Sequence, residues 1–183
     1  MDKPRENVQN ALTGTKTEEL LKQAAHGEAQ TYTRYRLFSD IADKEGYEPL
    51  RRLFEQSAEN EREHAALWYG YLDEFGNTEE NLENALSGER FESKTFYPDA
   101  ARTAKEEGFD EIAEKFALTG SVEENHAVAF AKMLDAMQNG SLYTGKADTV
   151  WLCLNCGYRT KGNEPPERCP LCSYPKGFFE KNS

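Results

Sequence analysis

Apolar side chains recur every three or four residues through most of the chain between residues 17 and 138, the spacing of helices that each bury one face. The predicted helices are residues 17–45, 48–76, 78–108 and 110–138. Thr15 or Thr17 is expected to cap the first helix and Thr78 the third, while Pro98 should kink or locally break the third. Four helices of this length predict an all-α four-helix bundle.

The two halves of this helical region resemble each other. Residues 46–74 align with residues 108–136 at an offset of 62, and the equivalent pairs include Phe54 with Phe116, Glu61 with Glu123, and His64 with His126. Upstream, Gly27 and Glu28 match Gly88 and Glu89 at an offset of 61. The pattern predicts two copies of one helical hairpin.

Each predicted helix carries a carboxylate in the middle of its inward face. The second and fourth helices carry a glutamate and a histidine three residues apart in an otherwise mostly apolar stripe, namely Glu61 with His64 and Glu123 with His126. The first and third helices carry Glu28 and Glu89 at the matching height. His26 has no glutamate three residues before it, so we expect it to be an ordinary exposed or partly exposed histidine.

Carboxylates buried together would each cost on the order of several kcal/mol unless cations compensate their charge. One Glu from each of two helices, plus Glu-x-x-His from each of the other two, is the ligand set of ferritin-like dimetal proteins. Residues three apart leave the same helix face, so the glutamate can bridge two ions while the imidazole binds one. A solvent-exposed pair is the alternative for a single Glu-x-x-His motif, but it leaves the duplication unexplained.

Glu92 breaks the symmetry of this predicted dimetal site. Its counterpart at the offset of 61 is Thr31, so a seventh ligand is available to only one ion. An ion with an alternative ligand can change position with its charge, because a ferric ion prefers carboxylate oxygen and a ferrous ion accepts imidazole nitrogen. The asymmetry indicates redox chemistry.

The four cysteines form a second candidate metal site. All of them lie in the last 31 residues, with the spacing C-x2-C-x12-C-x2-C. In a chain without an export signal this spacing indicates a tetrahedral iron or zinc site rather than disulfides, and a structural zinc ribbon is the alternative to rubredoxin-type iron. The predicted division is a metal-binding bundle over residues 1–140, a linker over 141–149 and a four-cysteine domain over 150–183.

Charge and hydropathy exclude several classes of partner. The net charge is -11 and no basic cluster offsets it, so a nucleic-acid surface is not expected. The N-terminal residues lack a signal region, and no apolar run approaches the roughly 20 residues of a membrane helix. We therefore expect a cytoplasmic protein without a membrane partner.

Taken together, these motifs resemble those of rubrerythrins over nearly the full length of the chain. The stretches that carry the resemblance are GEAQTYTRY, ENEREH, GERFESKTFYP, KEEGF, VEENH, CLNCGY and CPLCSYPKGFF. The resemblance implies a ferritin-like diiron four-helix bundle followed by a small rubredoxin-like β domain. Tyr174 is a departure, because many members have histidine there, and it could change the potential of the nearby iron without changing its ligands.

The resemblance also implies roles for individual residues. The implied diiron ligands are Glu28, Glu61, His64, Glu89, Glu92, Glu123 and His126. Glu61 and Glu123 would bridge the ions, and His64 and Glu92 would alternate on one iron. Tyr35 and Tyr97 would lie beside the site. The implied ligands of the third iron are Cys153, Cys156, Cys169 and Cys172, and zinc or manganese could replace iron at either centre.

The activity that the resemblance implies is a peroxidase that protects against oxidative stress. Two ferrous ions would reduce hydrogen peroxide to water, and the cysteine-bound iron would return electrons one at a time. Reduced rubredoxin or an NAD(P)H-dependent flavoprotein would be the donor. Two alternatives are a ferroxidase or iron-storage protein, which needs no built-in electron carrier, and a non-enzymatic bundle with a zinc ribbon, which leaves the carboxylates unexplained.

The short connection between the second and third helices predicts a homodimer. With helices ending at Gly76 and starting at Thr78, the ligands lie about 16 Å from either side of the gap. Parallel helices of a ferritin-like bundle would require a return of roughly 30 Å, whereas the gap reaches about 10 Å. We expect exchanged hairpins, in which residues 17–76 of one chain complete a site with residues 78–138 of the other.

Overall fold

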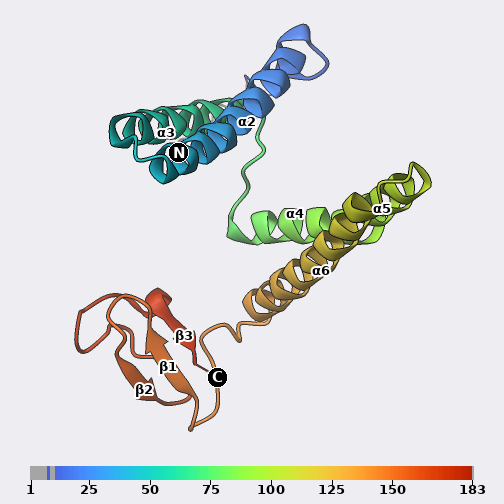
Figure 1. The fold of residues 1–183 in the computed structure, drawn as a ribbon. Coiled ribbons are helices and arrows are strands. Elements are labelled where there is room, and N and C mark those ends of the chain that lie inside the picture. Colours follow the sequence, from blue (N-terminus) through green and yellow to red (C-terminus); the bar gives the residue numbers. More distant parts are fainter. Residues whose placement is uncertain (1–7, 9–10, 183) are drawn as a thin grey trace. The chain divides into compact units, whose positions relative to one another are not determined.

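The computed structural model describes residue 8 and residues 11–182 as two compact units, one ending at Gly76 and one beginning at Asn77. The first unit holds the helices α2 (Lys16–Lys44) and α3 (Glu48–Tyr71) (Figure 1). The second holds α4 (Thr78–Phe91), the π turn η1 (Glu92–Phe96), α5 (Tyr97–Glu106), α6 (Asp110–Gln138), β1 (Val150–Cys153), β2 (Arg159–Lys161), the 3-10 turn η2 (Lys176–Phe178) and β3 (Phe179–Lys181). Among the described residues, no helix is long and apolar enough to cross a membrane.

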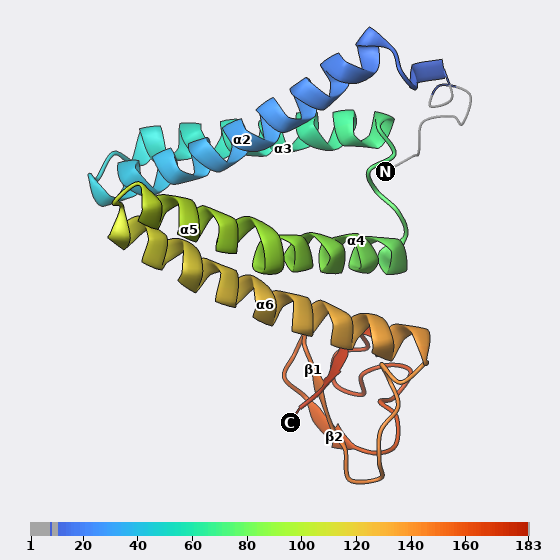
Figure 2. The same ribbon diagram turned by 90° about the vertical axis from the view of Figure 1, so that its right-hand side faces the viewer.

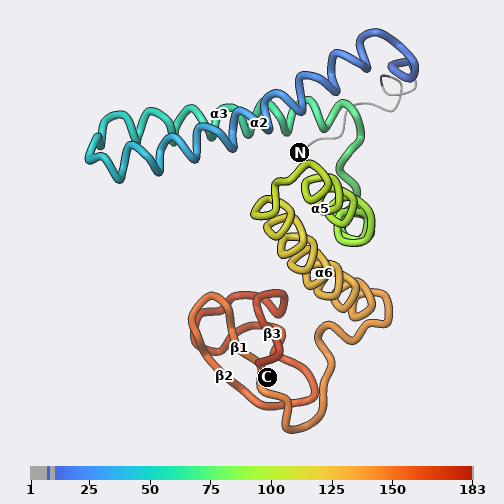
Figure 3. The backbone as a smooth tube through the Cα atoms, turned by 45° about the vertical axis from the view of Figure 1, so that its right-hand side comes forward, coloured from blue at the N-terminus to red at the C-terminus, as the bar shows by residue number. Residues whose placement is uncertain are grey.

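The helices α2 and α3 lie side by side as one hairpin, hairpin 1 (Figure 3). The Thr15 side chain accepts a hydrogen bond from the Glu18 amide and caps α2, and Gly46, with φ +80°, allows the turn that follows it. Small buried residues line the seam between the helices, namely Ala25, Ser39, Ala42, Ala58, Ala65 and Ala66. Their size lets the two backbones approach closely and leaves the bulkier side chains for the other faces.

The end of α3 differs from the sequence-based prediction. The helix stops at Tyr71 rather than near Gly76, and Asp73 follows with φ 55°, a left-handed conformation that a helix cannot continue through. The connection to α4 is therefore Leu72–Asn77, and the predicted two-residue gap is wrong. The cap of α4 is also Asn77 rather than Thr78, because Asn77 forms a capping box with Glu80.

The predicted third helix consists of three pieces that follow one another along α6 (Figure 2). The chain is not broken at Pro98. Instead, the π turn η1 precedes it, closed by a hydrogen bond from the Tyr97 amide to the Glu92 carbonyl. Pro98 then lies in the first turn of α5, where its missing amide is tolerated. The pieces α4, η1 and α5 together with α6 form hairpin 2.

Hairpin 2 repeats the small-residue seam of hairpin 1. Its buried positions are Leu86, Ser93, Ala104, Ala113, Gly120 and Ala127. Tyr97 packs directly over Gly120, because a Cβ at Gly120 would lie 3.0 Å from the Tyr97 Cβ. The seam fixes which face of each helix is left for the candidate metal ligands.

The C-terminal strands form a three-stranded antiparallel sheet of order β2-β1-β3. Its core is small and consists of Trp151, Cys153, Cys169 and Phe179, with the Trp151 Nε1 donating to the Gly162 carbonyl at 2.9 Å. The predicted fold class, a helical bundle protein with a small C-terminal β domain, agrees with these elements. The predicted boundaries at residues 140 and 150 stay a prediction.

Candidate metal centres

Hairpin 1 brings three candidate ligands together on one face. The His64 Nδ1 lies 3.0 Å from Glu61 Oε2 and 3.8 Å from Glu28 Oε1. The two carboxylates are half-buried, while the imidazole side chain is 53% exposed. We call this cluster half-site 1.

Hairpin 2 carries an equivalent cluster, half-site 2. The His126 Nδ1 lies 2.7 Å from Glu123 Oε2 and 3.6 Å from Glu89 Oε2. The His126 side chain is 52% exposed, close to the value for His64. The two half-sites therefore repeat each other in residue type, spacing and exposure, as two copies of one hairpin should.

The spacing within each half-site suits a cation. Nitrogen and oxygen ligands about 2.1 Å from one ion lie roughly 3 to 3.5 Å from their neighbours around it. The observed spacings of 2.7 to 3.8 Å bracket that range. In half-site 1 a hydrogen bond with Glu61, together with burial and the negative charge of Glu61, raises the pKa of Glu28. A cation bound between these carboxylates would compensate the charge that they bring together.

Glu92 and Tyr97 lie next to half-site 2 rather than within it. Glu92 is half-buried at the start of the π turn and does not belong to the close cluster of Glu89, Glu123 and His126. Burial, and then the carboxylates of Glu92, Glu123 and Glu89, raise the pKa of Tyr97. Tyr97 therefore stays a phenol near neutral pH, with three candidate ligands around it.

Tyr35 occupies the matching position in hairpin 1. Its ring lies 6.2 Å from that of Phe54, and the ring of Tyr97 lies 6.2 Å from that of Phe116. The two predicted tyrosines are thus held by the same aromatic contact in each hairpin.

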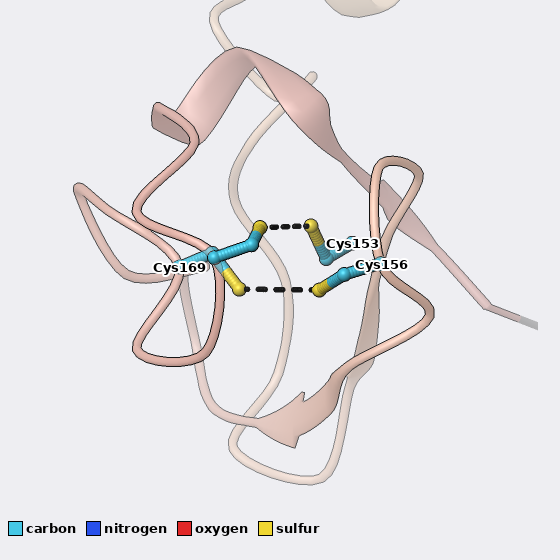
Figure 4. A group of neighbouring side chains, drawn as sticks. Cys153, Cys156 and Cys169 are labelled. Atoms are coloured by element: carbon cyan, nitrogen blue, oxygen red, sulfur yellow. Dashed lines mark hydrogen bonds between the residues drawn. The ribbon is translucent and has the colours of Figure 1, made fainter.

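The four cysteines come together in the C-terminal domain (Figure 4). The Sγ atoms of Cys153 and Cys172 are 3.8 Å apart, and those of Cys156 and Cys169 are 3.6 Å apart. Four sulfurs arranged tetrahedrally at about 2.3 Å from one ion would be about 3.8 Å apart. The Tyr174 backbone amide and then the Asn155 side chain lower the pKa of Cys172 to about 6, which favours the thiolate that a metal requires.

Comparison with known proteins identifies the family that carries this combination of clusters. The family model described as rubrerythrin matches residues 19–134 and 80–151, and the model described as the rubredoxin-like domain of rubrerythrin matches residues 151–180. The chain belongs to the rubrerythrin family. A rubrerythrin of Porphyromonas gingivalis is 36% identical, with 97% of this chain and 96% of that protein covered. Nigerythrin of Nitratidesulfovibrio vulgaris is 33% identical over 89% of this chain and 85% of that protein.

A solved structure of nigerythrin in a partially reduced state aligns with 93% of this chain and 91% of that chain at 30% identity. The TM-score of that alignment is 0.36. Family membership and the three clusters indicate a diiron oxidoreductase with a rubredoxin-type Fe(Cys)4 centre. The ferritin-like and rubredoxin-like fold class is thereby confirmed.

Sequence reasoning missed one contact and misjudged one surface. The contact is a hydrogen bond between the Trp68 side chain and the Glu28 carboxylate. The signal was the place of Trp68 one helical turn beyond His64 on the same stripe. Several stripe residues predicted to face the core are exposed within this chain, among them Leu50 at 48% and Ile112 at 50%. A two-helix layer closes only the seam, so a further layer is needed to cover this face.

Proposed function

We propose that this protein is a non-haem diiron peroxidase that reduces hydrogen peroxide to water. The observation that carries the proposal is the pairing of two equivalent Glu-Glu-His half-sites with a four-cysteine cluster in one chain. The reaction consumes one peroxide, two electrons and two protons and yields two waters. When bound, the diiron pair supplies the two electrons and the Lewis acidity for cleavage of the O–O bond.

The side chains supply the ligands, the charge balance and a hydrogen-bond donor. Glu61 and Glu123 are the proposed bridging ligands, and His64 and Glu92 are the proposed alternating ligands of one iron. Tyr97 keeps its hydroxyl proton because its pKa is raised by burial and by Glu92, so it can donate a hydrogen bond to a peroxide oxygen. Trp68 holds the Glu28 carboxylate in place through its hydrogen bond.

The four-cysteine centre is the proposed entry point for electrons. Reduced rubredoxin or an NAD(P)H-dependent flavoprotein is the proposed donor, and the cytoplasm is the proposed location. The acidic chain, with a net charge of -11, is suited to a partner with a complementary basic surface.

The connection between the hairpins supports a homodimer with exchanged hairpins. Seven residues of helix separate His64 from Tyr71, about 10 Å, and eleven separate Thr78 from Glu89, about 16 Å. If the two helices run parallel with their ligands level, as in a ferritin-like bundle, the connection must return about 27 Å along the axis. The seven Cα steps from Tyr71 to Thr78 reach at most about 25 Å, before any sideways distance between helices.

A chain with this connection cannot easily complete the bundle by itself, although the connection is longer than the sequence suggested. Exchange resolves the shortfall, because the two hairpins that build one site then come from different chains. The exposed ligand faces of both hairpins are the surfaces that such a partner would cover.

A single-turnover experiment tests the proposed activity. Protein loaded with iron and reduced without oxygen is mixed with one equivalent of peroxide per diiron site. We expect peroxide to disappear with formation of two waters and oxidation of the reduced centres, within seconds. Glu123→Gln, which removes a proposed bridging carboxylate, should slow this phase at least about a hundredfold.

The same experiment separates the alternatives. A ferroxidase would oxidise ferrous ions with dioxygen and release a ferric product, with peroxide no better as oxidant. A zinc ribbon would leave the C-terminal domain colourless after growth with iron, whereas ferric tetrathiolate absorbs in the visible range. Slow or absent peroxide consumption by fully loaded, reduced protein would refute the peroxidase.

A further inference from the structure

The stripes of α3 and α6 that carry the candidate ligands match in side-chain type until they pass the histidines. At an offset of 62 the matched pairs are Leu50 with Ile112, Phe54 with Phe116, Ser57 with Thr119, Glu61 with Glu123, and His64 with His126. One helical turn further on, α3 has Trp68 and α6 has Phe130. Tryptophan carries one N–H donor, whereas phenylalanine carries no polar group. The first difference in polar groups between the two stripes therefore lies directly beside the half-sites.

Trp68 uses its donor on a candidate ligand. Its side chain hydrogen-bonds the Glu28 carboxylate, a member of half-site 1 whose Oε1 lies 3.8 Å from the His64 Nδ1. The indole N–H is the donor, because it is the only polar group of the ring. A carboxylate has two oxygens, so Glu28 can accept this bond and still face an ion. The contact joins α3 to α2 and ties Glu28 to the helix that carries the other two members of half-site 1.

The indole ring is itself held in place. Trp68 is half-buried, and its ring stacks on that of Tyr71, with the centroids 6.4 Å apart and the planes at 28°. Packing thus restricts the direction in which the N–H points. The residue equivalent to Tyr71 in α6 is Met133, which is unbranched and flexible. Neither the donor nor the aromatic ring that supports it is repeated at the equivalent positions of hairpin 2.

Glu89 occupies the place of Glu28 in half-site 2, where its Oε2 lies 3.6 Å from the His126 Nδ1. The equivalent of Trp68 beside it, Phe130, is also half-buried but has no donor to offer. In metal sites, a group that hydrogen-bonds a ligating carboxylate fixes its orientation, and losing that group typically lowers metal affinity about 10- to 100-fold. Two half-sites with the same three ligand types are therefore supported differently.

We propose that Trp68 is a positioning residue that makes the two half-sites unequal, because it holds Glu28 in one orientation toward the ion of half-site 1 while Glu89 keeps its rotational freedom. This inference rests on the proposed dimetal site. A carboxylate that is already ordered loses less side-chain entropy when an ion binds. Binding of the ion in half-site 1 should accordingly depend on Trp68, and binding in half-site 2 should not.

Two changes at position 68 of the full-length protein remove the donor. Trp68→Phe introduces the residue that hairpin 2 has at the equivalent position. Trp68→benzothienylalanine keeps the size and shape of the indole and replaces its N–H by sulfur. Each change is made in the background of His126→Ala, which leaves half-site 1 complete, and of His64→Ala, which leaves half-site 2 complete.

Metal affinity is the first readout. Cobalt titration is followed by calorimetry and visible absorption, in which thiolate charge transfer separates cysteine-bound cobalt from cobalt in the hairpins. With His126→Ala, both changes at Trp68 should weaken the remaining hairpin ion about tenfold. With His64→Ala, neither change should alter the affinity by more than about twofold. Glu28→Ala should abolish the effect of Trp68→Phe, because both remove the same interaction.

The indole N–H resonance in an NMR spectrum reports the hydrogen bond without any metal. The chain has two tryptophans, and the Trp151 Nε1 donates to the Gly162 carbonyl. The signal that disappears in Trp68→Phe belongs to Trp68. It should move upfield and exchange faster with solvent in Glu28→Ala, and it should stay unchanged in Glu89→Ala.

The outcomes separate this inference from the proposed function. Equal weakening in both histidine backgrounds, or weakening by Trp68→Phe but not by benzothienylalanine, would indicate a packing role and overturn the inference. So would a Trp68 N–H signal that does not respond to Glu28→Ala. If the unaltered protein binds two ions in its hairpins that are indifferent to Trp68, only this inference fails. If it binds no pair of ions there, the proposed function fails as well.

Discussion

The proposed exchange of hairpins makes a complementation experiment decisive. His64→Ala removes a ligand from hairpin 1 and His126→Ala removes one from hairpin 2, so each variant alone has a defect in every site. When the two variants are unfolded together and refolded, roughly half of the dimers should contain one chain of each kind. In such a dimer one site carries both defects and the other carries none. About a quarter of all sites should therefore recover wild-type ligands, and peroxide turnover should recover in proportion.

Lengthening the connection between α3 and α4 tests the same proposed exchange of hairpins. In the proposed parallel arrangement the reach of the connection falls about 2 Å short of the return along the axis, so inserting eight Gly and Ser residues after Gly76 should supply about 26 Å more. Lengthening the loop from six to fourteen residues costs less than about 1 kcal/mol in closure entropy. The two hairpins of one chain would then meet at an effective concentration in the millimolar range. At micromolar protein they should therefore pair within the chain rather than between chains.

The lengthened protein should accordingly keep its turnover but lose complementation, because each chain now supplies both halves of its own site. Two differently tagged His64→Ala preparations, refolded together, are the control and should show no recovery. Complementation that is absent with the native connection would refute the exchange and leave the site itself untouched.

Three further predictions follow from individual contacts. With its metal removed, the protein should be alkylated by iodoacetamide at Cys172 near neutral pH, because the Tyr174 amide first of all lowers the pKa of this thiol to about 6. The alkylation rate should fall as the pH drops below about 6, and mass spectrometry measures both the modified residue and the rate. Hydrogen bonds from Arg51 and Arg52 lower the pKa of Glu48 from 4.5 to about 2. The stability that these bonds contribute should be present above pH 4.5 and lost as the pH falls toward 2. The thermal unfolding temperature of Glu48→Gln should not show this loss between pH 4.5 and 2. Trp151→Ala should destabilise the C-terminal domain by about 3 to 5 kcal/mol, measured by loss of thiolate-metal absorption in denaturant, and an unchanged midpoint would contradict the burial argument.

The clustering of the candidate ligands was predictable because it depends on residue type and spacing. A glutamate and a histidine three residues apart in a helix lie on the same face. Because this motif occurs twice, the sequence predicted two matching clusters. The cysteine spacing likewise predicted a four-sulfur cluster. Both expectations follow from local geometry, which one sequence contains in full.

Positions that depend on competing local effects were harder to predict. The end of α3 was placed five residues too late, because apolar residues at Tyr71 and Phe75 continue the helical spacing while Asp73 adopts a left-handed conformation. The π turn was present in the sequence as a change of offset, yet Pro98 suggested a break. Comparing the two repeats shows that an extra residue lies between two matched positions. It does not show whether a π turn or a break in the helix accommodates that residue.

The five carboxylates around the proposed site also determine its electrostatics. With neutral imidazoles, Glu28, Glu61, Glu89, Glu92 and Glu123 bring five negative charges. Two ferrous ions bring four positive charges and two ferric ions bring six, so the ligand set lies midway, one charge from balance in either oxidation state. Without Glu92 the reduced state would be neutral and the oxidised state would carry two excess positive charges at the proposed site, where a covering second hairpin would limit solvation. In the proposed diiron site the added carboxylate would thus make both ends of the redox cycle comparably tolerable, which is what a centre that must return to its starting state requires.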